Sequence, residues 1–215
     1  HKALTLPHTL GKLSAETIAH AMDVYNGDAN REHTVMPGMV YLSQPTENGT
    51  LYSLEELDAI WQVCQSKGLI LYIDGARLGY GLMSKACDMT LPDLAIRCDA
   101  FTIGGTKQGL LFGEALVIRN RALNRDFRYL IKQRGGLLAK GRLLGVQFSA
   151  ILEEELYFTL SRQADEFAMK IRRAFEAKGC PMLYDSYTNQ QYPILPDKLL
   201  HELEREFAFA FWCKT

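Results

Sequence analysis

The chain has 215 residues, 47% of them hydrophobic and 23% charged, a composition that excludes disordered, collagen-like and low-complexity proteins. Its 24 basic and 25 acidic residues give a net charge of -1, so no overall charge favours binding to nucleic acid or to a membrane surface. No apolar run is long enough to span a bilayer. The five cysteines lack a CxxC spacing, which favours reduced thiols and a cytoplasmic protein over a disulfide framework or a zinc site.

Short strands and helices alternate along the first half of the chain. We expect strands over residues 1–6, 39–43, 69–73, 100–103 and 114–118, and helices over residues 14–27 and 53–67. Ser14 is the N-cap expected for the first helix, and Ser53 with Glu56 forms a capping box for the second. Residues 69–73 (LILYI) are continuously apolar, as in a strand covered on both faces. The alternation predicts an α/β fold whose mostly parallel sheet has helices on both faces.

The second half of the chain has a different pattern. Past Arg121 it is helical as far as Gly179, then short strands are expected at 181–184 and 191–194, a helix at 196–206 and an apolar strand at 207–212. We therefore expect a large domain over residues 1–156 and an incomplete, smaller α+β domain over 157–215. Terminal strands at both ends, with no evident partners, suggest a central piece of a longer protein.

Polar side chains follow three of the expected strands, at the sheet edge where open α/β proteins bind ligands. Asp74 and Arg77 follow LILYI, Lys107 follows a Gly-Gly pair after AFTI, and QPTENG (residues 44–49) follows MVYLS. Each has a simpler interpretation: a turn-capping aspartate, a surface-loop lysine and a polar turn. Together, an aspartate and a lysine at neighbouring strand ends suit pyridoxal phosphate, which needs an amine and a carboxylate at opposite ends of its ring.

Several segments carry a resemblance to a known family. They are YIDGARLGYGL, FTIGGTKQGLLFGEALVI, SQPTENGTLYSLEEL, FRYLIKQRGGLLAKGRLLGVQF and TNQQYPILP, which span almost the whole chain. With them the chain resembles the threonine aldolase and aromatic amino acid β-eliminating lyase family of fold-type-I pyridoxal-phosphate enzymes, and it looks most like the bacterial low-specificity L-threonine aldolase branch. The resemblance implies an aspartate-aminotransferase-like fold, a small amino acid as substrate and a homodimer or homotetramer.

The resemblance also implies roles for individual residues. Lys107 is similar to the lysine that forms the Schiff base with pyridoxal 5'-phosphate, and Asp74 to the partner of its pyridinium nitrogen. Thr106 and Thr46 are expected to contact the cofactor, and Arg77 to bind the substrate α-carboxylate. The implied reaction cleaves the Cα–Cβ bond of a β-hydroxy amino acid, so that threonine gives glycine and acetaldehyde.

The sequence also departs from the family pattern. Many members have a histidine in an ENTH segment near the substrate hydroxyl, whereas this chain has Gln44-Pro45-Thr46-Glu47. Glu47 or a bound water is therefore expected to be the base, and β-elimination from another amino acid stays an alternative. The family's N-terminal phosphate-binding turn and ring-stacking residue would precede His1, and its second carboxylate-binding arginine would follow Thr215. A catalytically incompetent fragment is thus a further alternative.

One segment is strongly basic. Residues 119–142 contain eight basic side chains and a single acid, Asp126. Without a nucleic-acid-binding motif this pattern favours a solvated or subunit-facing surface over a nucleic-acid patch, and Lys140 or Arg134 could reach the cofactor phosphate of a partner subunit. The histidines have no metal-binding spacing, so no metal site is expected.

Overall fold

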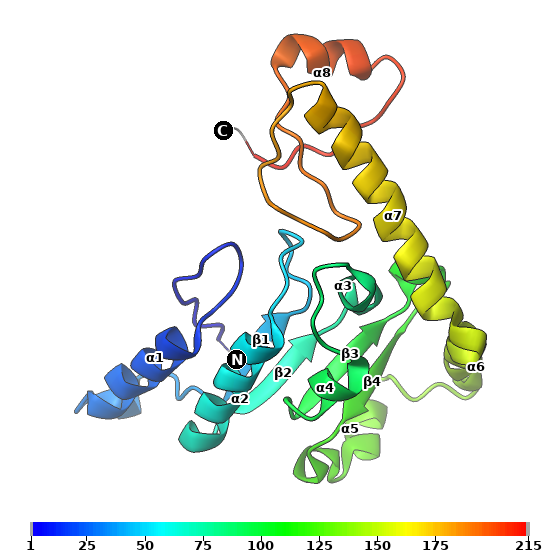
Figure 1. Cartoon of the computed structure of the whole chain (residues 1–215). Helices are drawn as coiled ribbons and strands as arrows, with labels where there is room; N and C mark the ends of the chain where they lie inside the picture. Colours follow the sequence, from blue (N-terminus) through cyan, green and yellow to red (C-terminus); the bar gives the residue numbers. More distant parts are fainter. Residues whose placement is uncertain (1, 214–215) are drawn as a thin grey trace.

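A computed structural model describes residues 2–213 and contains a four-stranded sheet of order β1-β2-β3-β4 (Figure 1). The strands are β1 (Met39–Ser43), β2 (Ile70–Asp74), β3 (Ala100–Gly104) and β4 (Glu114–Ile118). The first three are parallel, and β4 pairs antiparallel with β3. Residues 105–113 are too few for the crossover of about a dozen residues that a parallel β4 would need. The mostly parallel α/β sheet predicted from the sequence is confirmed.

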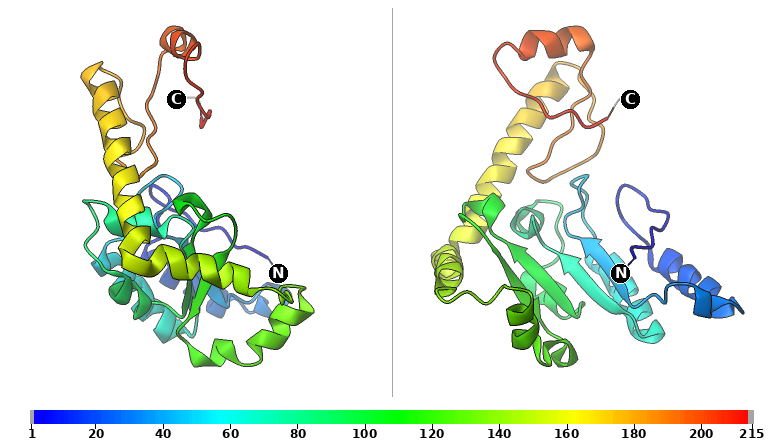
Figure 2. Two further views of the ribbon diagram at one scale, coloured as in Figure 1. Left: turned by 90° about the vertical axis from the view of Figure 1, so that its right-hand side faces the viewer. Right: turned by 180° about the vertical axis from the view of Figure 1, so that it is seen from behind.

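Helices lie on both sides of the sheet. Helix α2 and helix α4 pack on one face together with α1, while α6 lies at the side of the sheet next to β4 (Figure 2). The predicted caps form: the Ser14 hydroxyl accepts from the Thr17 N–H, and Ser53 and Glu56 make a complete capping box. The α-helices are α1 (Ala15–Gly27), α2 (Leu54–Lys67), α3 (Leu78–Met83), α4 (Leu91–Ala95), α5 (Phe127–Gln133), α6 (Arg142–Leu152), α7 (Leu156–Ala177) and α8 (Asp197–Leu203).

Four short 3-10 turns complete the regular structure: η1 (Arg31–His33), η2 (Thr106–Gln108), η3 (Arg121–Asn124) and η4 (Glu153–Glu155). Within residues 2–213, no helix is long and apolar enough to cross a membrane. The long helix α7 leads away from the sheet to the C-terminal segment (Figure 1). It begins one residue before the expected boundary at 156/157, and the division into two domains stays a prediction.

The hydrophobic core lies between the sheet and the helices of one face. Alternate residues of each strand point into it, as the two-residue period of a strand requires. The other face of β1 and β4 is more open, because Met39, Tyr41 and Leu116 remain 55%, 52% and 41% exposed. Buried core residues include Ile18, Val40, Leu42, Leu57, Ile60, Cys64, Leu71, Ile73, Leu94 and Phe101.

The expected strands near the chain ends are wrong. Residues 2–6 and 207–212 have no strand structure, and His1 lies outside the described residues. The strands expected at 181–184 and 191–194 reduce to one bridge between Met182 and Pro193, and the helix expected at 196–206 is shortened to α8. A strand forms only where a neighbour takes its backbone hydrogen bonds, and none of the sheet strands in the described chain lies beside these segments.

Candidate active site at the carboxyl ends of the strands

The turns that follow β2 and β3 are in direct contact. The Gly75 N–H donates to the Thr102 hydroxyl at 3.0 Å, and the Gly104 N–H donates to the Gly75 carbonyl at 2.9 Å. A Cβ on Gly75 would lie 1.9 Å from the Thr102 carbonyl oxygen, and a Cβ on Gly104 would lie 2.5 Å from that of Ala76. Only glycine permits so close an approach at these two positions. The structure therefore brings the Asp74 and Lys107 turns together at one edge of the sheet.

Asp74 is half-buried, and both of its carboxylate oxygens have partners. The Ala76 N–H donates to Oδ1 at 2.9 Å, which is the turn-capping role considered from the sequence, and the Tyr41 hydroxyl donates to Oδ2. Tyr41 is held by Tyr72 on the neighbouring strand, with 5.3 Å between the ring centroids. Burial, reinforced by the hydrogen bond to Asp74, raises the pKa of Tyr41, so the phenol keeps its proton and remains a donor.

Lys107 lies in η2 directly after β3. Its side chain is exposed and makes no ion pair with any residue between 2 and 213. Its backbone carbonyl accepts a hydrogen bond from the Tyr80 hydroxyl. Thr106 is exposed beside it, and Gln108 is 3% exposed with neither amide atom hydrogen-bonded among the described residues. Tyr80 thus holds the backbone of this turn, while the Lys107 side chain extends into solvent.

Arg77 and Glu47 form an ion pair across this edge. The Arg77 Nη1 lies 2.9 Å from the Glu47 Oε1, and the side chains are 19% and 62% exposed. Arg77 is the residue before α3, and Glu47 lies in the loop after β1, so their meeting depends on the parallel pairing of β1 with β2. The Tyr192 hydroxyl donates to the Glu47 carbonyl from a segment 145 residues further along the chain.

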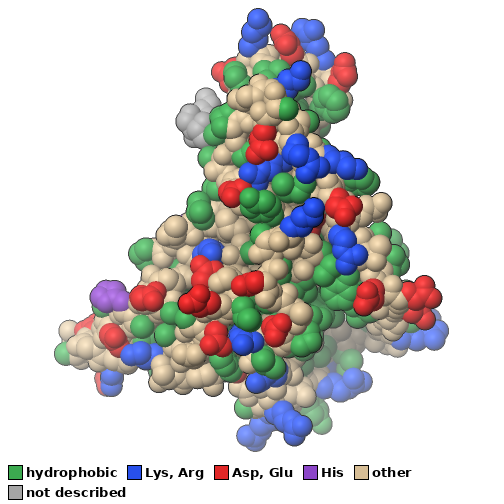
Figure 3. Space-filling view, in the orientation of Figure 1, with side chains coloured by type: hydrophobic (Ala, Val, Ile, Leu, Met, Phe, Trp, Pro, Cys, Tyr) green, Lys and Arg blue, Asp and Glu red, His purple; other side chains and the backbone are tan. Residues whose placement is uncertain are grey.

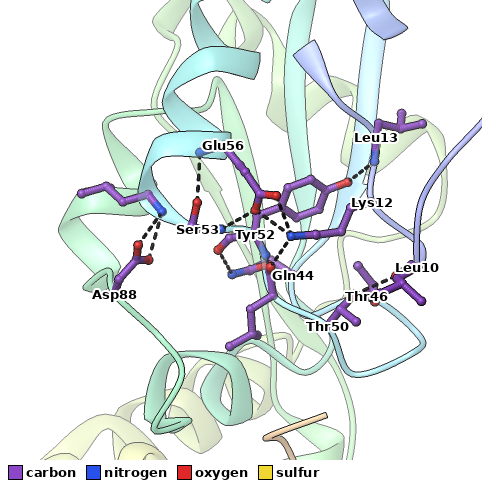
Figure 4. Close-up of polar contacts among 12 residues, drawn as sticks. Leu10, Lys12, Leu13, Gln44, Thr46, Thr50, Tyr52, Ser53, Glu56 and Asp88 are labelled. Carbon is purple, nitrogen blue, oxygen red and sulfur yellow. Dashed lines mark hydrogen bonds and ion pairs between the residues drawn. The ribbon is translucent and has the colours of Figure 1, made fainter. Parts of the chain in front are cut away.

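The loop that carries Glu47 is fixed by polar contacts at both ends (Figure 4). The Gln44 amide accepts from the Tyr52 N–H at 2.9 Å and donates to its carbonyl at 3.2 Å. The hydroxyls of Thr46 and Thr50 lie 2.7 Å apart, and Thr50 donates to the Leu10 carbonyl at 2.8 Å. Thr46 is 2% exposed, so its hydroxyl serves the loop itself.

A cleft of about 300 Å³ adjoins this loop on the side of the N-terminal segment. Its lining includes His8, Tyr41, Thr46, Glu47 and Tyr52. The cleft therefore reaches Glu47, but its lining does not include the residues that follow β2 and β3. Among residues 2–213 there is no cluster of three or more His, Cys, Asp or Glu side chains that could hold a metal ion.

A buried acid lies behind the lysine turn. Asp165 on α7 is 5% exposed, and burial raises its pKa to about 8, against a smaller opposite effect of the Asn189 backbone N–H. Burial and the nearby Asp165 charge both raise the pKa of Tyr80. Burial therefore favours the uncharged form of Asp165 behind the turn that carries Lys107.

Sequence reasoning found the strand-end residues but missed the three tyrosines that hold them. Tyr41 alternates with buried residues on β1, so its position on the open face could be predicted from the two-residue period of a strand. Tyr80 and Tyr192 gave no local signal, because they reach Lys107 and Glu47 from segments that only the tertiary fold brings close.

The fold places the chain among known enzymes. A threonine aldolase structure from Leishmania major superposes with a TM-score of 0.92 at 42% identity, covering 97% of this chain and 60% of that one. A putative L-allo-threonine aldolase from Listeria monocytogenes matches at a TM-score of 0.56 and 18% identity, over 74% of this chain and 45% of that one, which shows the fold alone. The fold is that of pyridoxal-phosphate enzymes of fold type I, as predicted.

The sequence comparisons agree with the fold. The low-specificity L-threonine aldolase of Pseudomonas aeruginosa is 35% identical over 136 residues, which is 63% of this chain and 39% of that protein. The Escherichia coli protein of the same name is 29% identical over 107 residues, or 49% of this chain and 32% of that protein. A family model described as "Beta-eliminating lyase" matches residues 1–197. The chain belongs to the β-eliminating lyase family, and it spans about two-fifths of the length of its Pseudomonas relative.

The residues at the strand ends fit the cofactor of that family. Pyridoxal phosphate needs a primary amine for its aldehyde carbon and an acid for its ring nitrogen. Lys107 offers an exposed amine and Asp74 a carboxylate on the adjacent turn, and Gly75 and Gly104 let the two turns approach each other closely. Lys107 and Asp74 therefore provide the amine and the carboxylate that the cofactor of this family requires.

Proposed function

We propose that this chain carries the catalytic strand ends of a pyridoxal-phosphate-dependent lyase that cleaves the Cα–Cβ bond of β-hydroxy amino acids, with threonine giving glycine and acetaldehyde. The observation that carries the proposal is the direct contact of the Asp74 and Lys107 turns in a chain of this family. When bound, pyridoxal phosphate supplies an electron sink for the pair released from the broken bond.

The protein's own residues supply binding and proton transfer. Lys107 would hold the cofactor covalently through its amine, and Asp74 would keep the ring nitrogen protonated. Thr106, exposed next to the lysine, is assigned to the cofactor phosphate; a direct cofactor contact of Thr46 stays a prediction. Arg77 would bind the α-carboxylate, and Glu47 would take the proton of the β-hydroxyl as the general base.

Product analysis tests this proposal against its alternative. The purified protein, loaded with pyridoxal phosphate, is incubated with L-threonine, and glycine and acetaldehyde are quantified beside keto acid and ammonia. We expect glycine and acetaldehyde in equal amounts, and their loss in Lys107→Ala. Keto acid and ammonia instead would identify β-elimination, the reaction in the family's name. Absence of both product pairs would support a fragment that keeps the sheet without activity.

Exposed apolar side chains support the proposal of a homodimer or homotetramer. Leu138 and Leu143 are each 59% exposed, Val146 58% and Tyr129 75%, and all four come from α5, α6 and the segment between them. Exposed apolar side chains that gather on neighbouring segments are typical of an interface. Lys140 lies in the same segment between α5 and α6. We therefore retain the proposal that a basic side chain of this segment reaches the cofactor phosphate of a partner subunit.

We also propose that the protein works in a reducing compartment such as the cytoplasm. Each of the five cysteines, all within residues 2–213, is a free thiol. Burial raises the pKa of Cys64 and of Cys98 to about 12, so both act as small core side chains rather than as reactive thiols. Figure 3 shows acidic and basic side chains interspersed over the face that it presents, in keeping with the balanced charge.

A further inference from the structure

The arginine assigned to the substrate carboxylate already binds a carboxylate of the chain itself. Glu47 Oε1 lies 2.9 Å from Arg77 Nη1, and Nη1 is the Arg77 nitrogen in hydrogen-bond contact with Glu47. A guanidinium offers a fork of donors, and a carboxylate that uses two of them binds better than one that uses a single donor. Glu47 therefore occupies the place of a substrate carboxylate, but with only part of the contacts that the place offers.

We propose that Glu47 holds Arg77 only until an amino acid substrate arrives, and that the substrate's α-carboxylate displaces Glu47 from Arg77 and so frees it to act as the base at the β-hydroxyl. This inference rests on the proposed function, because it uses Arg77 as the carboxylate site and Glu47 as the base. It adds an order of events. The α-carboxylate of the substrate binds Arg77, and this binding releases Glu47 to act as the base.

The exposures of the two side chains allow this exchange. The Glu47 side chain is 62% exposed, so leaving Arg77 costs little, since solvated ion pairs contribute little and water accepts the released carboxylate. The Arg77 side chain is 19% exposed and stays in place at the start of α3. The mobile partner is thus the glutamate, and the fixed partner is the arginine.

The surroundings of Glu47 limit how far it moves. Its carbonyl accepts from the Tyr192 hydroxyl, and the following Gly49 packs against Ser186 and Thr188 of the C-terminal segment. The backbone of the loop is therefore held while the side chain turns. In a β-hydroxy amino acid the carboxylate and the hydroxyl are on adjacent carbons, so a group displaced from the first stays within reach of the second.

The freed carboxylate completes a balanced step. Glu47 takes the proton of the β-hydroxyl, and the O–H electron pair becomes the second bond of the aldehyde carbonyl as the Cα–Cβ bond breaks. The pair of that bond remains on the Cα side, where bound pyridoxal phosphate would supply the electron sink, and a proton returned to Cα gives glycine.

Binding of glycine to the cofactor-loaded protein tests the exchange, with Glu47→Gln as the variant and Glu32→Gln as the matched control on an exposed residue of η1. The change in cofactor absorption is titrated with glycine and, in parallel, with methylamine, which lacks a carboxylate. We expect Glu47→Gln to bind glycine two- to five-fold more tightly, to bind methylamine no more tightly, and to turn over threonine at least 100-fold more slowly. Glu32→Gln should match the wild type.

Glycine affinity that is unchanged or lower in Glu47→Gln would overturn the proposal, since it would mean that Glu47 only orients Arg77. An equal gain for methylamine would overturn it as well. A second readout needs no cofactor: phenylglyoxal should modify Arg77, measured on its own peptide, faster in Glu47→Gln than in wild type, and an equal rate contradicts the pairing. A wild-type protein without any Lys107-dependent cofactor absorption would instead be a failure of the proposed function.

Discussion

The buried side chain of Asp165 makes the free energy of unfolding depend on pH. Its pKa of about 8 in the folded protein lies above the ordinary value of 3.8, because burial disfavours the charged form. Between these two values the folded chain binds a proton that the unfolded chain has lost, so this group's contribution to stability is complete below about pH 4 and is lost as the pH rises to about 8.

We therefore expect Asp165→Asn to remove a decline in the free energy of unfolding of up to about 1.4 kcal/mol per pH unit. Urea unfolding at a series of pH values between 4 and 9 measures this as the difference between variant and wild type. Asp126→Asn, at a side chain that is 70% exposed, is the control and should leave the slope unchanged. A wild-type slope preserved in Asp165→Asn would show that another group titrates.

Gly75 fixes the contact between the turns that follow β2 and β3. In Gly75→Ala the new Cβ would meet the Thr102 carbonyl oxygen at 1.9 Å, so the backbone of β2 or β3 must shift. We expect the free energy of unfolding to fall by about 2–3 kcal/mol or more. Gly145→Ala is a matched control: it lies in α6 with nothing within 4 Å of the added Cβ, and it should stabilise by about 0.5–1 kcal/mol. Equal effects in chemical denaturation would refute the account of Gly75.

For single residues, the sequence indicated candidate site residues by their position directly after an expected strand. Asp74 and Lys107 stood out because a charged side chain directly after an apolar strand needs an explanation, and the parallel order of β2 and β3 put both at one edge. The Arg77–Glu47 pair could not be read in the same way. Its formation depends on side-chain reach between two loops, which spacing in the sequence does not specify.

Among the elements, α3 connects the site to the rest of the molecule. It starts after Arg77, and the Tyr157 hydroxyl on α7 accepts from the Gly79 N–H at 3.0 Å. From the next position Tyr80 donates to the Lys107 carbonyl. A helix of six residues has little stability of its own, so α7 holds in place the element that supports both Arg77 and Lys107.

Tyr157→Phe should therefore destabilise the fold by about 1–3 kcal/mol, because it leaves the buried Gly79 N–H without an acceptor. Tyr129→Phe, at a ring that is 75% exposed, should change stability by less than about 0.5 kcal/mol. Thermal unfolding of both variants makes the comparison. A Tyr157→Phe protein as stable as wild type would mean that water or a shifted backbone replaces the hydroxyl.

Elements with strong local signals were predictable, and those that depend on partners were not. The capping box of α2 and the apolar run of β2 specify their own structure. The strands expected at residues 2–6 and 207–212 had the apolar composition of strands, but strand structure also requires a neighbouring strand, which local pattern cannot show. The antiparallel direction of β4 is explained by the short connection at residues 105–113, and the residues of β4 themselves do not indicate it.

For the whole molecule, the exposed apolar side chains of α5, α6 and the segment between them predict self-association. We expect sedimentation velocity to show a dimer or a larger species in the micromolar range, and Leu143→Glu to shift it towards the monomer by burying a charge at the contact. Val24→Glu, at a residue of α1 that is 58% exposed, is the control and should not change the distribution. A wild-type protein that is monomeric throughout, or an equal shift in both variants, would contradict this placement of the interface.

We propose Lys107 as the residue that holds pyridoxal phosphate. Borohydride reduction of the protein incubated with pyridoxal phosphate, followed by peptide mass spectrometry, tests it most directly because reduction makes the attachment permanent. We predict a phosphopyridoxyl group on the peptide containing Lys107, near one per chain, and its absence in Lys107→Ala with other lysines at background. Modification spread over surface lysines, or undiminished in Lys107→Ala, would contradict the assignment of this strand end as the cofactor site.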